Sequence, residues 1–338
     1  MQNPFFDLPS LLLPWYKENH RELPWRQDKE PYHVWLSEIM LQQTRVEAVK
    51  GYYARFLQAL PTIETLAAAD EETLYKLWEG LGYYSRVRNL HKAANEIMDR
   101  HSGSFPKKYE DIRALSGIGD YTAGAIGSIC FDLPTPAVDG NVLRVCTRLT
   151  ADPSPIDQAQ TKKQLTEKLA AVYPKESGDF TQALMELGAT VCVPNGGPLC
   201  SQCPLQTICL AHKQGIETTF PVKAKKKPRN ILEMTVLLLH DGNTYALRKR
   251  PKTGLLAGLW EFPHLDGKFS MEQVLEHLEQ QGITVSDVEK TVDKIHIFTH
   301  KEWHMTGVFL SCRQGGCYTW GKPSDYALPT AFRIFLDE

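Results

Sequence analysis

Apolar residues in the first two thirds of the chain recur at the three- and four-residue spacing of amphipathic helices. The stretches with this pattern are residues 34–60, 71–81, 89–101 and 161–173, and each predicts a helix with one buried face. The pattern changes after residue 230. There, "ILEMTVLLLH" (231–240) and "TYALRKR" (244–250) are apolar runs joined through Asp-Gly-Asn, which is typical of a β-hairpin. We therefore expect an all-α domain followed by an α/β (α+β) domain.

The two patterns meet in the segment "FPVKAKKKPRN", residues 220–230, which combines prolines with five cations and no acid. A chain of 338 residues is long enough for two or three separate cores. We predict domains at residues 1–219 and 231–338, joined by a basic linker over 220–230. The linker is either a solvated connection or a contact for nucleic-acid phosphates, and the sequence leaves both open.

Composition and charge bear on whether the protein binds nucleic acid or a membrane. The chain has 42% hydrophobic and 23% charged residues and a formal net charge of −2, so it lacks the overall basic footprint of many nucleic-acid binders. Because the cations are unevenly distributed, nucleic-acid binding stays open. The N-terminal apolar run is too short to span a membrane and has no basic region before it. We expect a cytoplasmic protein with no membrane partner.

Four of the eight cysteines lie in one short segment, residues 192–209: Cys192, Cys200, Cys203 and Cys209. Disulfides are rare in cytoplasmic proteins, so clustered thiols indicate a metal site. Four thiolates suit a structural zinc ion or an iron–sulfur cluster, and ligand type alone does not separate the two. Simple zinc sites tend to use two close pairs of ligands, whereas only Cys200 and Cys203 are closely spaced here. This spacing favours a [4Fe–4S] cluster.

The stretch "LSGIGDYTAG", residues 115–124, predicts a tight turn between two helices. Gly117 and Gly119 have no side chains to keep another backbone away, and the second helix begins with free amide groups. Such a corner is suited to a DNA phosphate, although glycine turns also join ordinary helix pairs. Asp139 follows in "PTPAVDGNVLRV", just before a helix start, where an aspartate could simply cap the helix.

Several long motifs occur in order along the chain. They are "LPWR" (23–26), "VWLSEIMLQQTRVEAV" (34–49), "GLGYYSRVRNL" (80–90), "LSGIGDYTAGAIGSI" (115–129), "AVDGNVLRV" (137–145), "MELGATVC" (185–192) and "GLLAGLWEFP" (254–263). With the four-cysteine segment, this set resembles the helix-hairpin-helix DNA glycosylases of the endonuclease III superfamily and, within it, the adenine DNA glycosylase (MutY) family. The resemblance covers nearly the whole chain. It implies a helix-hairpin-helix catalytic domain with a [4Fe–4S] cluster, followed by a Nudix-like recognition domain.

The activity implied by the resemblance is removal of adenine from double-stranded DNA at 8-oxoguanine:adenine or guanine:adenine mispairs, in base excision repair. We accordingly expect a monomer that associates with the nucleoid through DNA. By position in the matching motifs, Glu38 corresponds to the general acid and Asp139 to the carboxylate that stabilises the positively charged sugar. Without the resemblance, Glu38 would be taken for a solvent-facing helix residue. Its apolar neighbours Leu36, Ile39 and Met40 instead favour burial and a raised pKa.

Tyr121 occupies the position where relatives that cleave the strand carry a lysine, whose amine forms a Schiff base with the sugar. A phenol cannot do so, and a monofunctional glycosylase is implied, with Tyr121 and Asn141 ordering Asp139. The positions that correspond to the adenine pocket or to lesion contacts are Trp25, Arg26, Leu41, Gln43 and Thr44. Tyr83 matches the aromatic residue that inserts into the base stack beside the lesion.

The segment "HIFTHKEWHMTGVFL", residues 296–310, alternates apolar and polar residues and predicts a β-hairpin. Its Phe298, Thr299 and His300 match the Phe-Ser-His loop with which the family senses 8-oxoguanine. Threonine replaces serine but keeps a hydroxyl group. The stretch "MEQVLEHLEQQG" (271–282) lacks the paired acidic pattern of a Nudix hydrolase. We therefore expect a binding domain without pyrophosphatase activity.

Two features leave alternatives open. Seven residues separate Cys192 from Cys200, one more than is common in the family, and this puts the occupancy of the cluster in question. The alternative functions are an endonuclease III-like glycosylase/lyase for oxidised pyrimidines and a non-catalytic mispair-binding protein. Tyr121 and the additional C-terminal domain argue against the first. Adenine release that depends on Asp139 would exclude the second.

Overall fold

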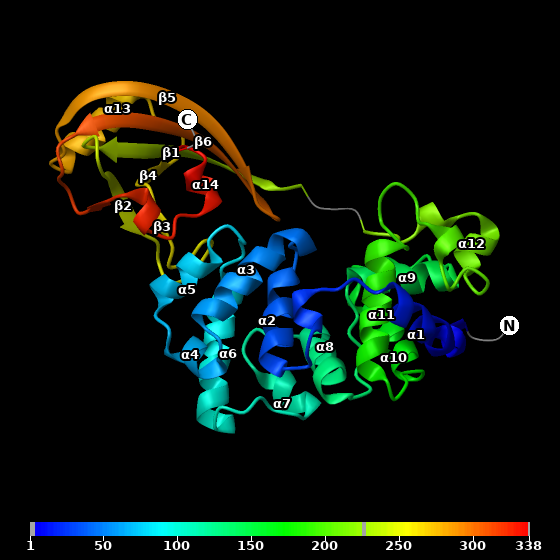
Figure 1. Ribbon diagram of the computed structural model, residues 1–338. Coiled ribbons are helices and arrows are strands. Elements are labelled where there is room, and N and C mark those ends of the chain that lie inside the picture. Colours follow the sequence, from blue (N-terminus) through cyan, green and yellow to red (C-terminus); the bar gives the residue numbers. More distant parts are fainter. Residues whose placement is uncertain (1–3, 225–227, 337–338) are drawn as a thin grey trace. The chain divides into compact units, whose positions relative to one another are not determined.

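The protein is described by a computed structural model that covers residues 4–224 and 228–336 (Figure 1). The chain divides into two compact units, one made of residues 1–68 and 88–225 and the other of residues 69–87 and 226–338. Part of the predicted basic linker, residues 225–227, lies outside the described residues, as do the ends of both predicted domains at 1–3 and 337–338. Among the described helices, none has the length and apolar character to cross a bilayer.

The first unit is helical. Its α-helices are α1 (Leu8–Asn19), α2 (Pro31–Leu41), α3 (Val46–Ala59), α4 (Ile63–Ala68), α6 (Ser85–His101), which begins in the other unit, α7 (Tyr109–Ala114), α8 (Asp120–Phe131), α9 (Gly140–Thr150), α10 (Ala159–Ala170), α11 (Ser177–Thr190) and α12 (Leu210–Gln214). Short 3-10 turns lie at Pro4–Asp7, Pro24–Arg26, Cys200–Gln202 and Glu217–Thr219. The helices predicted at 89–101 and 161–173 are confirmed as α6 and α10.

The helical pattern of residues 34–60 is interrupted between α2 and α3. Gln43 adopts a left-handed backbone with φ 58°, and the Thr44 amide donates to the Leu41 carbonyl over 3.2 Å. A left-handed residue cannot continue a right-handed helix. Hydrophobic spacing does not detect such a turn, because the apolar positions continue on both sides of it.

Helix α11 packs against α1, α8 and α9. Phe180, Leu184 and Leu187 of α11 are fully buried together with Leu8 and Leu12 of α1. Burying side chains of this kind contributes roughly 1.5–3 kcal/mol each relative to exposure. The same core includes Val142 and Val145 of α9, so it fixes both α9 and α11, two of the helices that line the site described below.

The glycine-containing turn at residues 115–119 joins α7 to α8, and the two predicted flanking helices are confirmed. Gly117 has φ 76°, and a Cβ atom there would lie 2.5 Å from Cβ of Asn89. Both the backbone angle and the close approach require glycine. Gly119 is the N-cap residue of α8, with open space around it.

The second unit contains a mixed seven-stranded sheet with the order β3-β2-β1-β6-β5, in which β4 also pairs with β1 and β7 with β2. The strands are β1 (Asn230–His240), β2 (Tyr245–Lys249), β3 (Trp260–Glu261), β4 (His264–Asp266), β5 (Val285–Ile297), β6 (Lys301–Cys312) and β7 (Thr319–Gly321). Both predicted hairpins are confirmed, since β1 pairs antiparallel with β2 and β5 with β6. Strands β1 and β6 are parallel.

Side chains alternate between the two faces of the sheet. Val236 and Leu238 of β1 pack on one face with Phe332 of α14 (Thr330–Arg333). Leu237 and Leu239 pack on the other face with α13 (Met271–Gln280). A 3-10 turn at Pro323–Asp325 and helix α5 (Glu71–Trp78), which confirms the helix predicted at 71–81, complete the unit. The Glu79 carboxylate, just after α5, pairs with Arg333 over 2.9 Å.

Candidate active site

A cavity of about 720 Å³ lies in the first unit. Small-molecule sites usually occupy about 300–1,000 Å³, so this volume suits a nucleobase with its sugar. The sequence singled out eleven residues of this unit other than the cysteines, and the cavity is lined by all of them: Trp25, Arg26, Glu38, Leu41, Gln43, Thr44, Gly117, Gly119, Tyr121, Asp139 and Asn141.

Glu38 lies on α2 and is only 6% exposed. Its neighbours Leu36, Ile39 and Met40 are also buried. Removal from water disfavours the charged carboxylate and raises the pKa of Glu38 to about 7. The negative charge of Asp139 acts in the same direction. A carboxyl group with this pKa is protonated in a substantial fraction of molecules at neutral pH and can donate a proton.

Tyr121, in the first turn of α8, donates a hydrogen bond from its phenol to Oε2 of Glu38 over 2.6 Å. This bond opposes the effect of burial, because it stabilises the charged carboxylate and lowers the pKa of Glu38. Burial and the neighbouring carboxylates hold the pKa of Tyr121 itself well above its usual value, so the phenol stays neutral. The resemblance associates Tyr121 with Asp139, whereas its hydrogen bond in this structure goes to Glu38.

Asp139 is the N-cap residue of α9 and also lines the cavity. Its Oδ1 atom accepts from the Val142 amide and its Oδ2 atom from the Asn141 side-chain amide, both over 2.8 Å. Burial raises the pKa of Asp139, and the two hydrogen bonds act to lower it. The capping role and the place in the cavity are therefore compatible, because the cap fixes the carboxylate where it faces the cavity.

Asn141 is held by Arg144, one turn further along α9. The Arg144 Nη2 atom donates to Oδ1 of Asn141 over 2.9 Å and to the Gly188 carbonyl over 2.7 Å. A Cβ atom on Gly188 would lie 2.6 Å from Cβ of Asn141. Glycine at this position therefore allows α11 to approach the start of α9 closely, which orients Asn141 toward Asp139.

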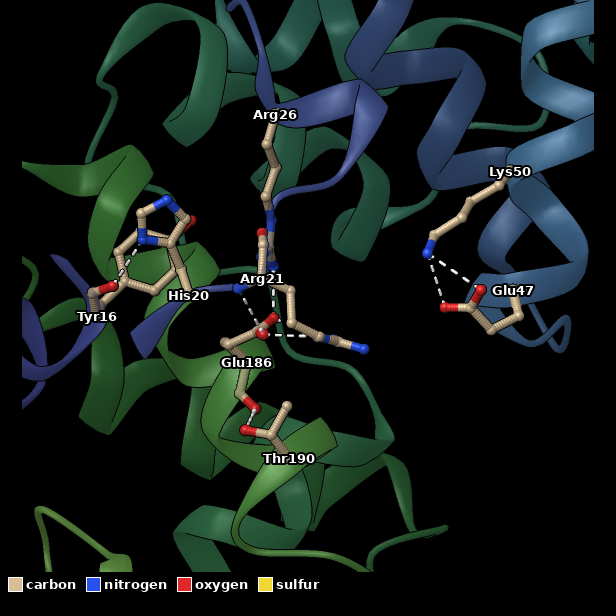
Figure 2. A network of polar contacts seen from close by, with 8 residues as sticks. All are labelled: Tyr16, His20, Arg21, Arg26, Glu47, Lys50, Glu186 and Thr190. Atoms are coloured by element: carbon tan, nitrogen blue, oxygen red, sulfur yellow. Dashed lines mark hydrogen bonds and ion pairs between the residues drawn. The ribbon is translucent and has the colours of Figure 1, made fainter. Parts of the chain in front are cut away.

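The sequence did not single out Glu186, although it lies on the cavity wall. Its buried carboxylate accepts hydrogen bonds from Arg21 (Nε, 2.6 Å) and Arg26 (Nη2, 2.8 Å) (Figure 2). Burial acts to raise the pKa of Glu186, but the hydrogen bonds and charges of the two arginines outweigh it and leave the pKa below its usual value. Gln182, Met185, Glu186 and Ala189 line the cavity from one face of α11. That helical spacing is the signal by which the sequence could have indicated Glu186.

The remaining predicted residues of the first unit differ in how far they are exposed to solvent. Trp25 is 6% exposed and packs edge-on against Tyr53, with 5.5 Å between ring centroids. Gln43 and Thr44 lie in the turn between α2 and α3, where the left-handed backbone at Gln43 interrupts the helix. Trp25 is therefore as buried as Glu38, whereas Gln43 is exposed.

The residues that match the family's 8-oxoguanine loop and its stack-inserting aromatic residue lie in the second unit. Phe298, Thr299 and His300 form the turn between β5 and β6, and Phe298 packs against Trp303 with 4.8 Å between ring centroids. Tyr83 is 47% exposed, and its phenol oxygen lies 2.8 Å from Oγ1 of Thr299. The structure thus brings Tyr83 and Thr299 together although 216 positions separate them in the sequence.

The four cysteines of the predicted metal site line one small cavity together with Arg148, His212 and Glu217. Cys192 is buried, and its sulfur accepts a hydrogen bond from Nη1 of Arg148 over 3.3 Å. Within the described ranges, Cys200, His212 and Glu217 each offer one possible ligand atom, and these three atoms lie within 4.8 Å of one another. The sulfur atoms of the four cysteines are not all within this distance of one another.

Family models match both units of the chain. A model described as "HhH-GPD superfamily base excision DNA repair protein" matches residues 36–174, and a model of the NUDIX domain matches residues 234–338. Among solved structures, a thermostable thymine-DNA glycosylase is 25% identical with a TM-score of 0.57, covering 62% of this chain and 97% of that one. Endonuclease III in a non-covalent DNA complex is 23% identical with a TM-score of 0.54, covering 64% of this chain and 99% of that one. The predicted fold classes, an all-α helix-hairpin-helix region followed by an α/β Nudix-like region, are confirmed.

Relatives of known function extend over most of the chain. Adenine DNA glycosylase of Rattus norvegicus is 38% identical over 350 residues, which cover 86% of this chain and 67% of the rat protein. Adenine DNA glycosylase of Buchnera aphidicola subsp. Acyrthosiphon pisum is 33% identical and covers 89% of this chain and 85% of its own length. The chain belongs to the adenine DNA glycosylase family of base excision repair enzymes.

Proposed function

We propose that the protein excises adenine from double-stranded DNA where adenine is paired with 8-oxoguanine or guanine, by hydrolysing the N-glycosidic bond without cutting the strand. The observation that carries the proposal is the cavity in which Glu38, Tyr121 and Asp139 meet, with the pKa of Glu38 raised to about 7. The cavity suits a base that has left the duplex, since a stacked base leaves its glycosidic bond inaccessible.

Glu38 is the proton donor in this proposal. Adenine is a poor leaving group as an anion, and protonation at N7 allows it to leave neutral. The buried Glu38 carboxyl group is suited to the transfer, because its raised pKa keeps a proton available at neutral pH. Once ionised, the same carboxylate can take a proton from the attacking water.

Asp139 stabilises the positive charge that develops on the sugar as the bond to adenine breaks. Two carboxyl groups with separate tasks are the usual arrangement for cleaving glycosidic bonds. The hydrogen bonds from Asn141 and from the Val142 amide favour the ionised form of Asp139 and fix its orientation. Tyr121 supplies no amine, so the sugar forms no Schiff base and the strand stays intact.

Glu186, held by Arg21 and Arg26, orients the base. The Glu186 carboxylate has a lowered pKa and stays ionised, so it can act only as an acceptor of hydrogen bonds. The exocyclic amino group of adenine is a donor, whereas the equivalent position of guanine carries a carbonyl acceptor. A fixed anion on the cavity wall therefore favours adenine over guanine.

Cys192, Cys200, Cys203 and Cys209 would hold a [4Fe–4S] cluster. A single zinc ion with zinc–sulfur bonds of about 2.3 Å would bring its sulfur ligands within about 3.8 Å of one another, whereas a cluster separates them more widely. The loose convergence of the sulfur atoms around one cavity supports the cluster. When bound, it would brace residues 192–209. Iron and sulfide analysis should give about four iron atoms per chain, and one zinc per chain in their place would overturn this assignment.

Glycosylase assays on duplexes with adenine opposite 8-oxoguanine, guanine or thymine test the proposed activity. We expect adenine release to be fastest opposite 8-oxoguanine and slowest opposite thymine, with no strand cleavage and no borohydride-trapped adduct. Asp139→Asn should lower the single-turnover rate about 10³-fold. Unchanged release by Asp139→Asn would contradict the mechanism, and absence of release from every duplex would contradict the function.

A further inference from the structure

A second cavity adjoins the large one in the first unit. It has a volume of about 200 Å³ and shares Tyr121, Val138 and Lys162 with the large cavity. This volume is below the usual range for a small-molecule site, so it suits part of a nucleotide rather than a separate ligand. A nucleotide in the large cavity therefore has a neighbouring space into which its backbone can extend.

Lys162 is the one shared residue that carries a charge at neutral pH. It lies on α10, where Thr161, Leu165 and Leu169 are buried. Lys162 itself is partly exposed, and Thr166, one turn further along the helix, also lines the small cavity. The buried face fixes α10, and the adjacent face presents the Lys162 side chain where the two cavities meet.

The ammonium group of Lys162 is free to bind a ligand. Within the part of the chain that the structure describes, it makes no ion pair and no side-chain hydrogen bond. The other two cations that line the large cavity are Arg21 and Arg26, and both donate to the Glu186 carboxylate (Figure 2). Lys162 is therefore the cation of this lining whose charge is not already paired.

An everted nucleotide brings two phosphates toward the cavity, one on each side of its sugar. The carboxyl groups of Asp139 and Glu186 make this approach unfavourable unless cations or amides offset the charge. The turn at residues 115–119 is predicted to hold one phosphate at the start of α8. Helix α9 also begins on the cavity wall, but Asp139 itself caps it through the Val142 amide over 2.8 Å. One phosphate is thus left without a partner among these groups.

We propose that Lys162 binds this second phosphate beside the everted adenosine, and that the adjoining cavity takes the sugar–phosphate backbone next to it. The inference rests on the proposed function, which places the everted nucleotide in the large cavity. A lysine ammonium offers three donors and a full charge, and hydrogen bonds between charged groups are about twice as strong as neutral ones. The contact is the same for every base, so it adds affinity and not selectivity.

The salt dependence of binding measures this contact. Each phosphate that a cation neutralises adds about 0.9 to the slope of log Kd against log salt concentration for duplex DNA. The probe is a duplex with a tetrahydrofuran abasic analogue opposite 8-oxoguanine. We expect Lys162→Gln to weaken binding about tenfold at low salt and to reduce the slope by about 0.9. Lys162→Arg keeps the charge and should keep the slope.

Lys163→Gln is the matched control. Lys163 is the next residue of α10 and carries the same charge, but its side chain is 78% exposed, lies 3.9 Å from Oε1 of Glu167 and lines neither cavity. Its substitution should leave the affinity and the slope nearly unchanged. Equal effects of Lys162→Gln and Lys163→Gln would mean that Lys162 acts only through the overall charge of the protein, and the inference would be wrong.

Neutral methylphosphonates in the DNA test the contact directly. They replace, one at a time, the two phosphates that flank the abasic analogue, and each replacement should weaken binding by the wild type. In Lys162→Gln one of the two replacements should lose its effect, because the cation that it would deprive of a partner is already absent. If both replacements weaken Lys162→Gln as much as the wild type, or if its slope equals that of the wild type, Lys162 binds neither phosphate.

These measurements involve no chemical step, so they separate the inference from the activity. Adenine release by the wild type, together with unaltered DNA binding by Lys162→Gln, would leave the proposed function standing and overturn the inference. A reduced slope and one lost methylphosphonate effect, in a protein that releases no adenine from any duplex, would support the phosphate contact and overturn the proposed function.

Discussion

Two walls of the cavity each bury a glutamate, and the two carboxyl groups have opposite pKa shifts. On α2, Glu38 is 6% exposed and its pKa is raised to about 7. On α11, the Glu186 side chain is 0% exposed and its pKa is lowered. Loss of water acts to raise the pKa of both groups. The difference comes from their neighbours, since Glu38 has Asp139 and one phenol beside it, whereas Glu186 accepts from two guanidinium groups.

The comparison shows that burial alone does not decide the charge of a carboxyl group. A buried glutamate that accepts no hydrogen bond from a cation can hold a proton and deliver it, and a buried glutamate hydrogen-bonded to two arginines is a fixed anion. The proposed mechanism needs both kinds of glutamate in one cavity, because the base has to be protonated and also oriented. Substitutions that separate the two roles are therefore the most informative.

Glu38→Gln should produce the largest effect. The amide has nearly the same shape but no acidic proton, so the single-turnover rate of adenine release should fall about 10²–10⁴-fold, the range for loss of a general acid. Affinity for a duplex with an abasic analogue should change little, since that ligand needs no protonation. A rate within tenfold of wild type would show that Glu38 is not the acid.

Glu186→Gln should act mainly on stability. Removing one partner of a buried ion pair usually costs about 3–5 kcal/mol. We expect about 2 kcal/mol here, because the Arg21 side chain is 38% exposed and can regain water. Urea unfolding measures the change.

Glu47→Gln is the matched control for that measurement. The Glu47–Lys50 pair is drawn with the Glu186 network in Figure 2. Its oxygen and nitrogen are 2.8 Å apart, but the Glu47 side chain is 80% exposed. Exposed pairs contribute about 0–1 kcal/mol, so Glu47→Gln should leave the free energy of unfolding nearly unchanged. Equal losses for the two variants would contradict the assignment of Glu186 as the anchored anion.

The sequence predicted one of these two glutamates and missed the other for a physical reason. The apolar neighbours of Glu38 are adjacent in the chain and agree with its burial, but Glu38 was singled out because of the family resemblance. Helical spacing could have placed Glu186 on the cavity face of α11. It carries no information about the charge of Glu186, which depends on pairing with Arg21, 165 positions away. The catalytic roles of Glu38 and Asp139 came from the family resemblance rather than from their surroundings.

The fold likewise has features that local sequence predicts and features that depend on residues far apart in the chain. Helices α6 and α10 and the two hairpins follow from local hydrophobic patterns and turn residues, and the structure confirms them. The turn at Gln43 and the contact between Tyr83 and Thr299 depend on one backbone angle and on tertiary structure. No local pattern indicates that residues 69–87 belong to the compact unit of the sheet.

Tyr121→Phe should give the smallest effect, a displacement of the pH profile. Glu38 must be protonated to act as the acid, so the rate should fall as the pH rises through about 7. The Tyr121 hydrogen bond stabilises the ionised form and lowers this pKa. Its removal should raise the pKa and move the alkaline limb of the profile upward by about one pH unit or less.

The position of that limb is independent of how much the maximal rate falls, so a general loss of activity in Tyr121→Phe does not obscure the result. Tyr173→Phe provides the comparison, since it removes a phenol that bonds to Thr181 and does not line the cavity. Its alkaline limb should coincide with that of the wild type. A limb that stays in place or moves to lower pH in Tyr121→Phe would mean that the Tyr121 phenol does not set the acidity of Glu38. The raised pKa would then depend on burial and Asp139 alone.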